Sequence, residues 1–232
     1  MLFNSINYLF FLPIVIIIYW LLSKKKLKYQ NLFLLASSYF FYAQWDYRFL
    51  FLLIFSTLLD YSTGLKIAKV NIKDKKIWLF VSVFINLGFL AVFKYFDFFI
   101  DTFMKTFSIF GVSLELSTLN LILPVGISFY TFHGISYVID IYKEKIKPEK
   151  NFIDYSLFVS FFPLLVAGPI ERATHLLPQI KRNRRFDYLQ FVDGLKQILW
   201  GLFKKVVIAG YSGRNCATHS GETVPIFKEL VS

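Results

Sequence analysis

The 232-residue sequence is poor in cysteine and histidine, and each scarcity removes a class of protein from consideration. Its one cysteine, Cys216, cannot form a disulfide within the chain. Its three histidines, His133, His175 and His219, are too scattered to have the spacing of a zinc site. The catalytic-serine, phosphate-loop and dinucleotide-binding motifs are absent as well. The sequence therefore predicts neither a disulfide-stapled domain nor a metal-binding or nucleotide-binding enzyme.

Acidic residues are also scarce, since 15 Asp and Glu face 26 Lys and Arg, for a net charge of +11. A nucleic-acid-binding protein would carry its basic residues on one face of a soluble module. Here 18 of the 26 fall in four short clusters between apolar blocks. Membrane proteins use basic loops in this way to fix their orientation. The charge therefore predicts a lipid bilayer, and not a nucleic acid, as the partner.

Apolar residues are abundant: 56% of the chain is hydrophobic, 20% is aromatic, and 29 residues are Phe. They form long uncharged blocks, which is typical of helices that cross a membrane. The fold class predicted from this pattern is all-α, a polytopic transmembrane helical bundle. The five predicted spans are 6–22, 29–45, 49–65, 77–93 and 119–139. Residues 94–118 mix Phe with charges, which favours an amphipathic segment at the interface.

Short basic loops stay in the cytoplasm, and three of the four basic clusters agree on one topology. With 24–28 inside, the N-terminus lies outside, and the alternating spans then bring 66–76 and 143–150 inside as well. We therefore expect a multi-pass protein with an extracytoplasmic N-terminus.

The sixth apolar block breaks the alternation. It runs from Tyr155 to Ile170, has only 16 residues and contains Pro163 and Pro169. A full crossing would place the basic loop around 182–185 outside, whereas a re-entrant hairpin keeps it inside. The hairpin is favoured, because the block is shorter than the about 17–25 residues of a span. The following segment, 186–209, predicts a helix at the interface or at the edge of a bundle.

Polar residues in the fifth block share one side of the predicted helix. Tyr130, His133, Tyr137 and Asp140 are spaced i, i+3, i+7 and i+10, which places them within an arc of about 80°. Polar side chains without partners are costly in hydrocarbon, so this stripe is expected to face protein or water. It is either a structural stripe that bonds neighbouring helices or the wall of a substrate channel. His133 as a catalytic base is less favoured, because no second base or carboxylate is spaced with it.

Two further candidates lie outside this stripe. Asp60 lies near the cytoplasmic end of the predicted span 49–65, so it is either an intramembrane functional carboxylate or a side chain that reaches the nearby interface. Glu171 and Arg172, with His175, follow the sixth block. They form either a cytoplasmic funnel that attracts an anionic donor or a solvated loop.

The motifs LPVGISFYTFHGISYVIDIYK (123–143), FPLLVAGPIER (162–172) and GLFKKVVIA (201–209) resemble the membrane-bound O-acyltransferase family. The resemblance is closest to the bacterial branch that includes alginate O-acetyltransferase, and further pieces in family order extend it over 1–209. It implies a partial fold of that family in a bacterial cytoplasmic membrane. It also implies that the polar stripe, with Glu171 and Arg172, borders the reaction chamber.

The resemblance further implies transfer of an acetyl or similar acyl group to a hydroxyl of a cell-envelope polysaccharide or other polymer. The donor would be acetyl-CoA or an acyl carrier acting as a substrate, with no bound cofactor or metal. Secreted or periplasmic acyltransferase proteins would be partners. The family's catalytic histidine lies in a Trp-Arg-Arg-Trp-His-like context.

The end of the sequence departs from the family, since no Trp precedes His219 and the residues around it do not match. No catalytic residue is therefore assigned, and neither His219 nor His133 receives that role. We expect residues 1–209 to be the N-terminal part of an acyltransferase domain and 210–232 to be a polar tail. The 232-residue polypeptide alone is expected to be inactive. The competing hypothesis is a non-enzymatic membrane scaffold or a transporter of a polymer or acyl carrier.

Overall fold

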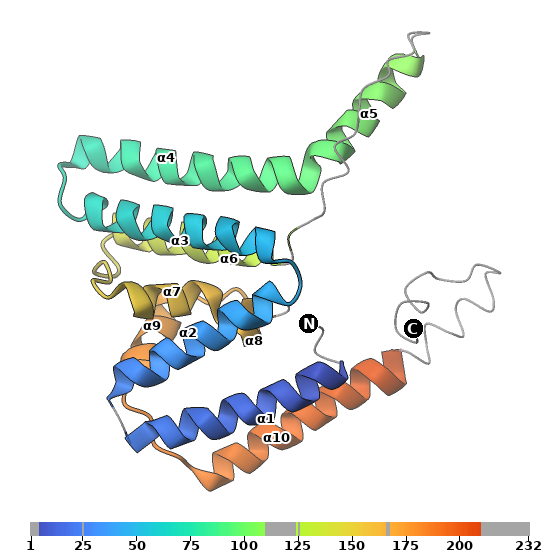
Figure 1. The fold of residues 1–232 in the computed structure, drawn as a ribbon. Helices are drawn as coiled ribbons and strands as arrows, with labels where there is room; N and C mark the ends of the chain where they lie inside the picture. The colour runs from blue at the N-terminus through green and yellow to red at the C-terminus, as the bar shows by residue number, and fades with distance from the viewer. Residues whose placement is uncertain (1–4, 25, 110–123, 125, 166–167, 210–232) are drawn as a thin grey trace. The chain divides into compact units, whose positions relative to one another are not determined.

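The computed structural model describes residues 5–24, 26–109, 124, 126–165 and 168–209, and every regular element among them is helical (Figure 1). The all-α prediction is therefore confirmed for the described residues. The chain divides into two compact units, Met1–Asn183 and Arg184–Ser232. The first contains α1 (Ile6–Leu21), α2 (Leu27–Ala43), α3 (Tyr47–Ile67), α4 (Ile72–Leu90), α5 (Phe96–Ile109), α6 (Ile127–Tyr142), α7 (Phe152–Ser160), α8 (Phe162–Leu165) and α9 (Ala173–Lys181). The second contains α10 (Tyr188–Phe203) and the π-helical segment Lys204–Ala209.

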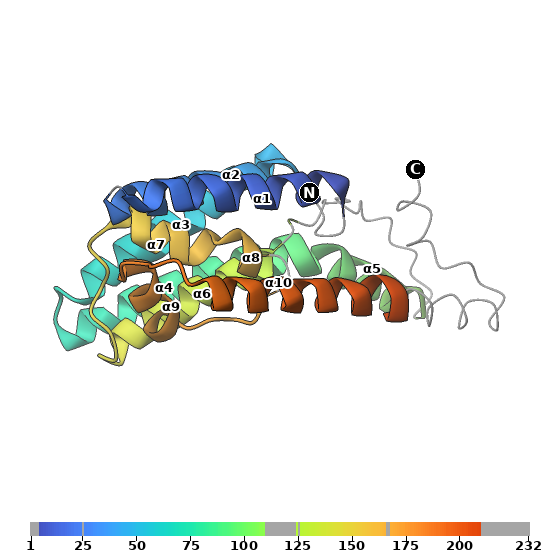
Figure 2. The ribbon, with the colours of Figure 1, turned by 90° about the horizontal axis from the view of Figure 1, so that it is seen from below.

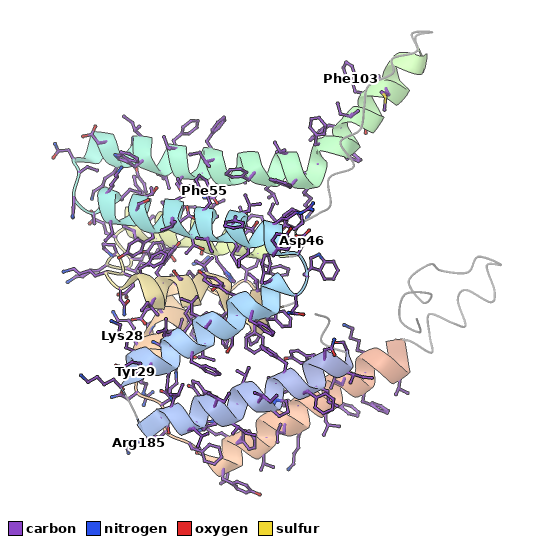
Figure 3. The ribbon with its side chains drawn as sticks, in the orientation of Figure 1. Lys28, Tyr29, Asp46, Phe55, Phe103 and Arg185 are labelled. Carbon is purple, nitrogen blue, oxygen red and sulfur yellow. The ribbon has the colours of Figure 1, made fainter. Side chains whose placement is uncertain are left out.

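Short polar side chains start several helices by accepting a backbone N–H that has no partner within the helix. The Ser5 hydroxyl accepts from the N–H of Tyr8 at the start of α1. The Asp46 carboxylate, labelled in Figure 3, accepts from the N–H of Arg48 at 2.8 Å and begins α3. Ser5 and Asp46 thus set the first residues of α1 and α3.

Packing in the first unit centres on α6, which contacts both α3 and α4, while α7 contacts α2 and α9 (Figures 1 and 2). Aromatic side chains fill the space between these helices. The rings of Tyr137 on α6 and Tyr155 on α7 lie 4.4 Å apart between centroids, and both side chains are fully buried. A smaller core joins α1, α2 and α8 through Val15, Phe41 and Phe162. The bundle therefore holds α6 between partners on several sides.

The distribution of polarity in α3 and α4 is the reverse of that in a water-soluble bundle. On α4, Ser82 and Asn86 are buried, whereas Phe80 and Phe84 are 68% and 67% exposed. On α3, Thr57 and Asp60 are buried and Phe51 is 74% exposed. Phe55, labelled in Figure 3, is half exposed and packs edge-on against Phe89 of α4. Exposed apolar side chains of this kind are typical of a contact with lipid or with another protein.

Among the described residues, two helices are long and apolar enough to cross a membrane, Tyr47–Ile67 and Asp74–Tyr95. They correspond to the predicted spans 49–65 and 77–93. The first predicted span forms a shorter apolar helix, Ile6–Leu21. Helix α4 ends at Leu90, whereas its predicted span ends at residue 93. Five π-helical residues, Ala91–Tyr95, then continue the helical path into α5. Part of the predicted interfacial segment is therefore helical, and its residues 110–118 lie outside the described part of the chain.

The part of the fifth predicted span that the structure describes becomes helical at Ile127. Helix α6 starts at Ile127, preceded by Gly126 with φ of 77°. This left-handed conformation is costly for residues with a Cβ, and a Cβ here would also meet the backbone oxygen of Leu165. The turn at Gly126 thus brings the start of α6 against α8. Residues 119–123 lie outside the described residues.

The sixth block is interrupted twice. Helix α7 ends at Ser160, Phe161 adopts an extended ψ of 109°, and the four-residue α8 follows. Residues 168–172 then run without helix to α9. The nine residues of α7 rise only about 14 Å, less than half of a hydrocarbon core of about 30 Å. Neither α7 nor α8 is therefore long enough to cross a membrane alone.

Basic segments gather at one end of the first unit. The start of α2, where Figure 3 labels Lys28, lies at the same end as the α3–α4 and α6–α7 loops (Figures 1 and 3). The ammonium of Lys75, in the first turn of α4, bonds the carboxylate of Glu144, in the α6–α7 loop, at 2.9 Å and lowers the pKa of Glu144. The three basic clusters that were predicted to share one side of a membrane therefore share one end of the bundle.

Candidate functional site

The predicted polar stripe of α6 is buried inside the first unit. Tyr130 and His133 are each 1% exposed, Tyr137 is not exposed, and Asp140 is 5% exposed. The Tyr130 hydroxyl and Asp140 Oδ2 are buried and make no hydrogen bond within the described residues. The stripe therefore faces protein, as its geometry predicted, and its role in binding a substrate stays a prediction.

The structure brings two of the separate candidates together, because His133 accepts a hydrogen bond from the backbone N–H of Glu171. The bond joins Nε2 to the nitrogen at 3.2 Å. A neutral imidazole that accepts at Nε2 carries its proton on Nδ1. This Nδ1 is buried beside the backbone of Val159, and the ring lies 5.5 Å from that of Phe158. His133 thus fastens the non-helical stretch before α9 to α6.

The side chain of Glu171 turns toward the surface. Its Oε2 lies 2.8 Å from Nδ1 of His175, and His175 also contacts Gln179, one turn further along α9. Arg172 is exposed and occupies the position that begins α9, without a side-chain capping bond. Glu171 therefore connects the buried His133 to a polar surface strip, which suits both the funnel and the solvated loop.

Tyr137 anchors the α6–α7 loop. Its hydroxyl accepts the backbone N–H of Glu149 at 2.9 Å. The Glu149 carboxylate in turn accepts the N–H groups of Lys150 and Asn151, and it pairs with Lys181 of α9 at 2.9 Å. Glu149 was not among the predicted site residues. It is 7% exposed and connects three elements at the basic end of the unit.

A second polar junction, which sequence reasoning missed, joins α2, α7 and α9. The Asn31 amide donates to Asp154 Oδ1 at 2.8 Å and to the carbonyl of Ile180 at 3.1 Å. Asn151 donates to the other oxygen of Asp154 at 2.9 Å. Asn31 and Asp154 are 1% and 7% exposed. The sequence did offer a signal for this junction, because Asn31 and Asp154 are polar residues at the edges of two apolar blocks.

Asp60 does not reach an interface, so the interpretation that its side chain extends to the membrane surface is wrong. It is 1% exposed, and its Oδ1 accepts from Ser82 at 2.8 Å and from Asn86 at 2.7 Å. Ser56 donates to the side-chain oxygen Oδ1 of Asn86 and extends the network along α3. A buried carboxylate is retained where charge-assisted hydrogen bonds satisfy it. Two donors one turn apart in the apolar part of α4 supply these bonds.

Glycines allow α6 to approach this network closely. A Cβ on Gly134 would collide with Oδ2 of Asp60, and a Cβ on Gly64 would lie 2.8 Å from the Tyr137 ring. Gly134 directly follows His133 in α6. The contact between Asp60 and Gly134 therefore fixes the position of α6 at the residue next to the buried histidine.

The described residues contain no group of three or more His, Cys, Asp and Glu that could hold a metal ion. What the arrangement offers instead is a set of hydrogen-bonding groups between helices, with one buried imidazole bonded to the backbone N–H of Glu171. Such groups position helices and bind hydroxyl or carbonyl groups of a ligand.

Comparison with curated proteins finds similarity over 90% of this chain. It is 39% identical to "Probable alginate O-acetylase AlgI" of Pseudomonas putida, covering 43% of that protein. It is 38% identical to the protein of the same name in Pseudomonas aeruginosa, covering 40% of it. It is 36% identical to "Peptidoglycan O-acetyltransferase" of Helicobacter pylori, covering 44% of it. No protein-family model and no solved structure matches the chain.

The chain spans less than half the length of each of these relatives. They are members of the membrane-bound O-acyltransferase family. The resemblance stated from the motifs is thereby confirmed over nine-tenths of the chain, without any assignment of its catalytic residue. By sequence, this chain is a relative of the alginate O-acetylases and peptidoglycan O-acetyltransferase of the membrane-bound O-acyltransferase family.

Proposed function

We propose that the chain is a multi-pass protein of the bacterial cytoplasmic membrane with its N-terminus outside. The reversed polarity of α3 and α4 supports this location, because their apolar faces are outside and their polar residues are paired inside. The basic loops at one end of the bundle support a cytoplasmic location for that end. In this arrangement α7, α8 and the stretch before α9 form a re-entrant hairpin, with their free backbone groups held by protein.

The activity proposed for the whole protein is transfer of an acetyl or similar acyl group to a hydroxyl of a cell-envelope polymer. The single observation that carries this proposal is the similarity to relatives named as O-acetylase and O-acetyltransferase. The donor would be acetyl-CoA or an acyl carrier, and secreted or periplasmic acyltransferase proteins would take part. No catalytic residue is assigned to this chain.

Within that activity, His133 acts as a positioning residue. Its Nε2 is already occupied by the backbone N–H of Glu171, so it is not free to remove a proton from an acceptor hydroxyl. Its bond holds Glu171 and Arg172 at the start of α9. The buried stripe of Tyr130, Tyr137 and Asp140 would border the reaction chamber, and Glu171 and Arg172 would line its cytoplasmic entrance.

A chimera tests the proposed activity. Residues 1–209 of this chain would replace the corresponding N-terminal part of the Pseudomonas aeruginosa relative, to which it is 38% identical. In cells that lack that protein, we expect the chimera to restore O-acetyl groups on exported alginate, measured by infrared or NMR spectroscopy. The 232-residue chain alone is the matched control and should restore none. A chimera that reaches the membrane in normal amount but leaves alginate unacetylated would count against the proposal.

Labelling of single cysteines tests the proposed topology. With Cys216 replaced by serine, a cysteine introduced at Asn183 should not react with a membrane-impermeant maleimide in intact cells, because the hairpin keeps this loop inside. A cysteine introduced at Asp46, in the α2–α3 turn, should react as the control for outside access. Strong labelling at 183 would show that the sixth block crosses the membrane completely.

A further inference from the structure

Helix α10 of the second unit has a wide apolar face. None of its residues is buried, and the side chains of Leu189, Leu199 and Trp200 are 78%, 69% and 57% exposed. An uncovered apolar surface of this kind marks a contact with another protein or with a membrane. Charge and geometry along the helix distinguish between these two partners.

The polar residues of α10 and its immediate extension form a narrow stripe. At 100° per residue they lie within an arc of about 120°, and the apolar residues cover an arc of about 200°. The stripe consists of Gln190, Asp193, Gln197, Gly201, Lys204 and Lys205. Lys196 alone among the charged residues lies on the apolar side, where its long stem can lie along the surface with the ammonium in water. This distribution is typical of a helix that lies in the plane of a membrane interface.

Both ends of α10 are positively charged. Arg184 and Arg185 precede it, Lys204 and Lys205 follow it, and the stretch 184–205 contains five basic and two acidic residues. Both acidic groups already accept hydrogen bonds, Asp187 from the first backbone N–H groups of the helix and Asp193 from Gln197. The Lys204 ammonium lies 5.2 Å from the centre of the Trp200 ring. Cations beside exposed aromatic rings match the headgroup region of an anionic membrane.

We infer that α10 lies along the cytoplasmic membrane surface, with its apolar face among the acyl chains and its basic ends on anionic phospholipid headgroups. A transmembrane path would place Asp193 and Lys196 in hydrocarbon, which is expensive. The inference rests on the proposed membrane location but not on acyl transfer, so loss of the proposed activity would leave it standing.

Spin labels on the full chain in lipid nanodiscs test this inference. In a background with Cys216 replaced by serine, labels would be placed singly at the apolar positions 195, 199 and 202 and at the polar positions 190, 197 and 201. We expect preferential collision with oxygen at the first set and with a water-soluble nickel chelate at the second, at a similar depth along the helix. A label at Phe84 of α4, whose side chain is 67% exposed, provides the reference for a membrane-spanning position.

The lipid composition tests the role of charge. Labels at the apolar positions should lie deeper in nanodiscs of phosphatidylcholine mixed with phosphatidylglycerol than in nanodiscs of phosphatidylcholine alone. Replacing Arg184, Arg185, Lys204 and Lys205 by glutamine should abolish this difference. Three results would overturn the inference. Label depth could change steadily along α10, as in a helix that crosses the membrane, or protein could shield the apolar positions from both reagents. The third is that the apolar positions lie equally deep in the two lipids.

Discussion

Replacing Gly134 by alanine is expected to lower the free energy of unfolding by roughly 3 kcal/mol, because the new methyl group displaces a buried carboxylate from its donors. Asp60 Oδ2 occupies the space in which the alanine Cβ would lie. Oδ1 is held by Ser82 and Asn86, so the carboxylate cannot move without lengthening bonds of 2.8 and 2.7 Å. Thermal unfolding of the purified protein in mild detergent would measure the loss.

Two further variants show whether the loss arises at this contact. Gly88→Ala on α4 is the matched control, since a Cβ there meets nothing within 4 Å, and it should leave the melting temperature nearly unchanged. The double variant Gly134→Ala with Asp60→Ala removes both partners of the clash. It should be more stable than the sum of the two single losses predicts, by about 1 kcal/mol or more. Additive losses would mean that the methyl group introduced at position 134 does not clash with the Asp60 carboxylate.

Replacing Asn31 by leucine is expected to cost roughly 3 kcal/mol of stability, because it leaves a buried carboxylate and a buried carbonyl without their shared donor. The Asn31 amide bonds Asp154 at 2.8 Å and the Ile180 carbonyl at 3.1 Å, across three helices. Loss of these bonds should loosen α9 from α2. Limited proteolysis within 182–187, together with thermal unfolding, would report both effects.

Gln179→Leu provides the comparison for Asn31→Leu, since Gln179 also donates hydrogen bonds from its amide but lies exposed on α9. It should change stability by less than about 0.5 kcal/mol, as is usual for surface substitutions. Asn31→Asp, which places a second carboxylate beside Asp154, should be at least as harmful as Asn31→Leu. A stable Asn31→Asp protein would show that the junction contributes little to holding the helices together.

Much of the helical organisation followed from the sequence because apolar blocks, capping residues and basic loops are local signals. The stripe of Tyr130, His133 and Tyr137 was predicted to face away from lipid from its spacing alone, and these residues are buried. The break after Ser160 was signalled by the short length and the prolines of the block. The identity of the partners was not predictable in the same way.

Asp60 shows why partners escape sequence reasoning. Its burial depends on which face of α4 meets α3, and only the packed helices place Ser82 and Asn86 beside the carboxylate. The bond between His133 and Glu171 depends likewise on a turn in the chain, because it uses a backbone N–H that every residue but proline carries. Side-chain type gives no signal for such a bond.

The two buried polar junctions, at Asp60 and at Asn31, also differ in how soon their partners emerge as the polypeptide leaves the ribosome. The donors for Asp60 are 22 and 26 residues further along, so a helical pair can satisfy it soon after both members emerge. Asn31 must wait for Asp154, 123 residues later, which at roughly 5–20 residues per second is on the order of ten seconds of translation. During that interval the Asn31 amide has not yet met Asp154 and can contact chaperones and the insertion machinery. We therefore expect nascent α2 to depend on these factors for longer than the α3–α4 pair does.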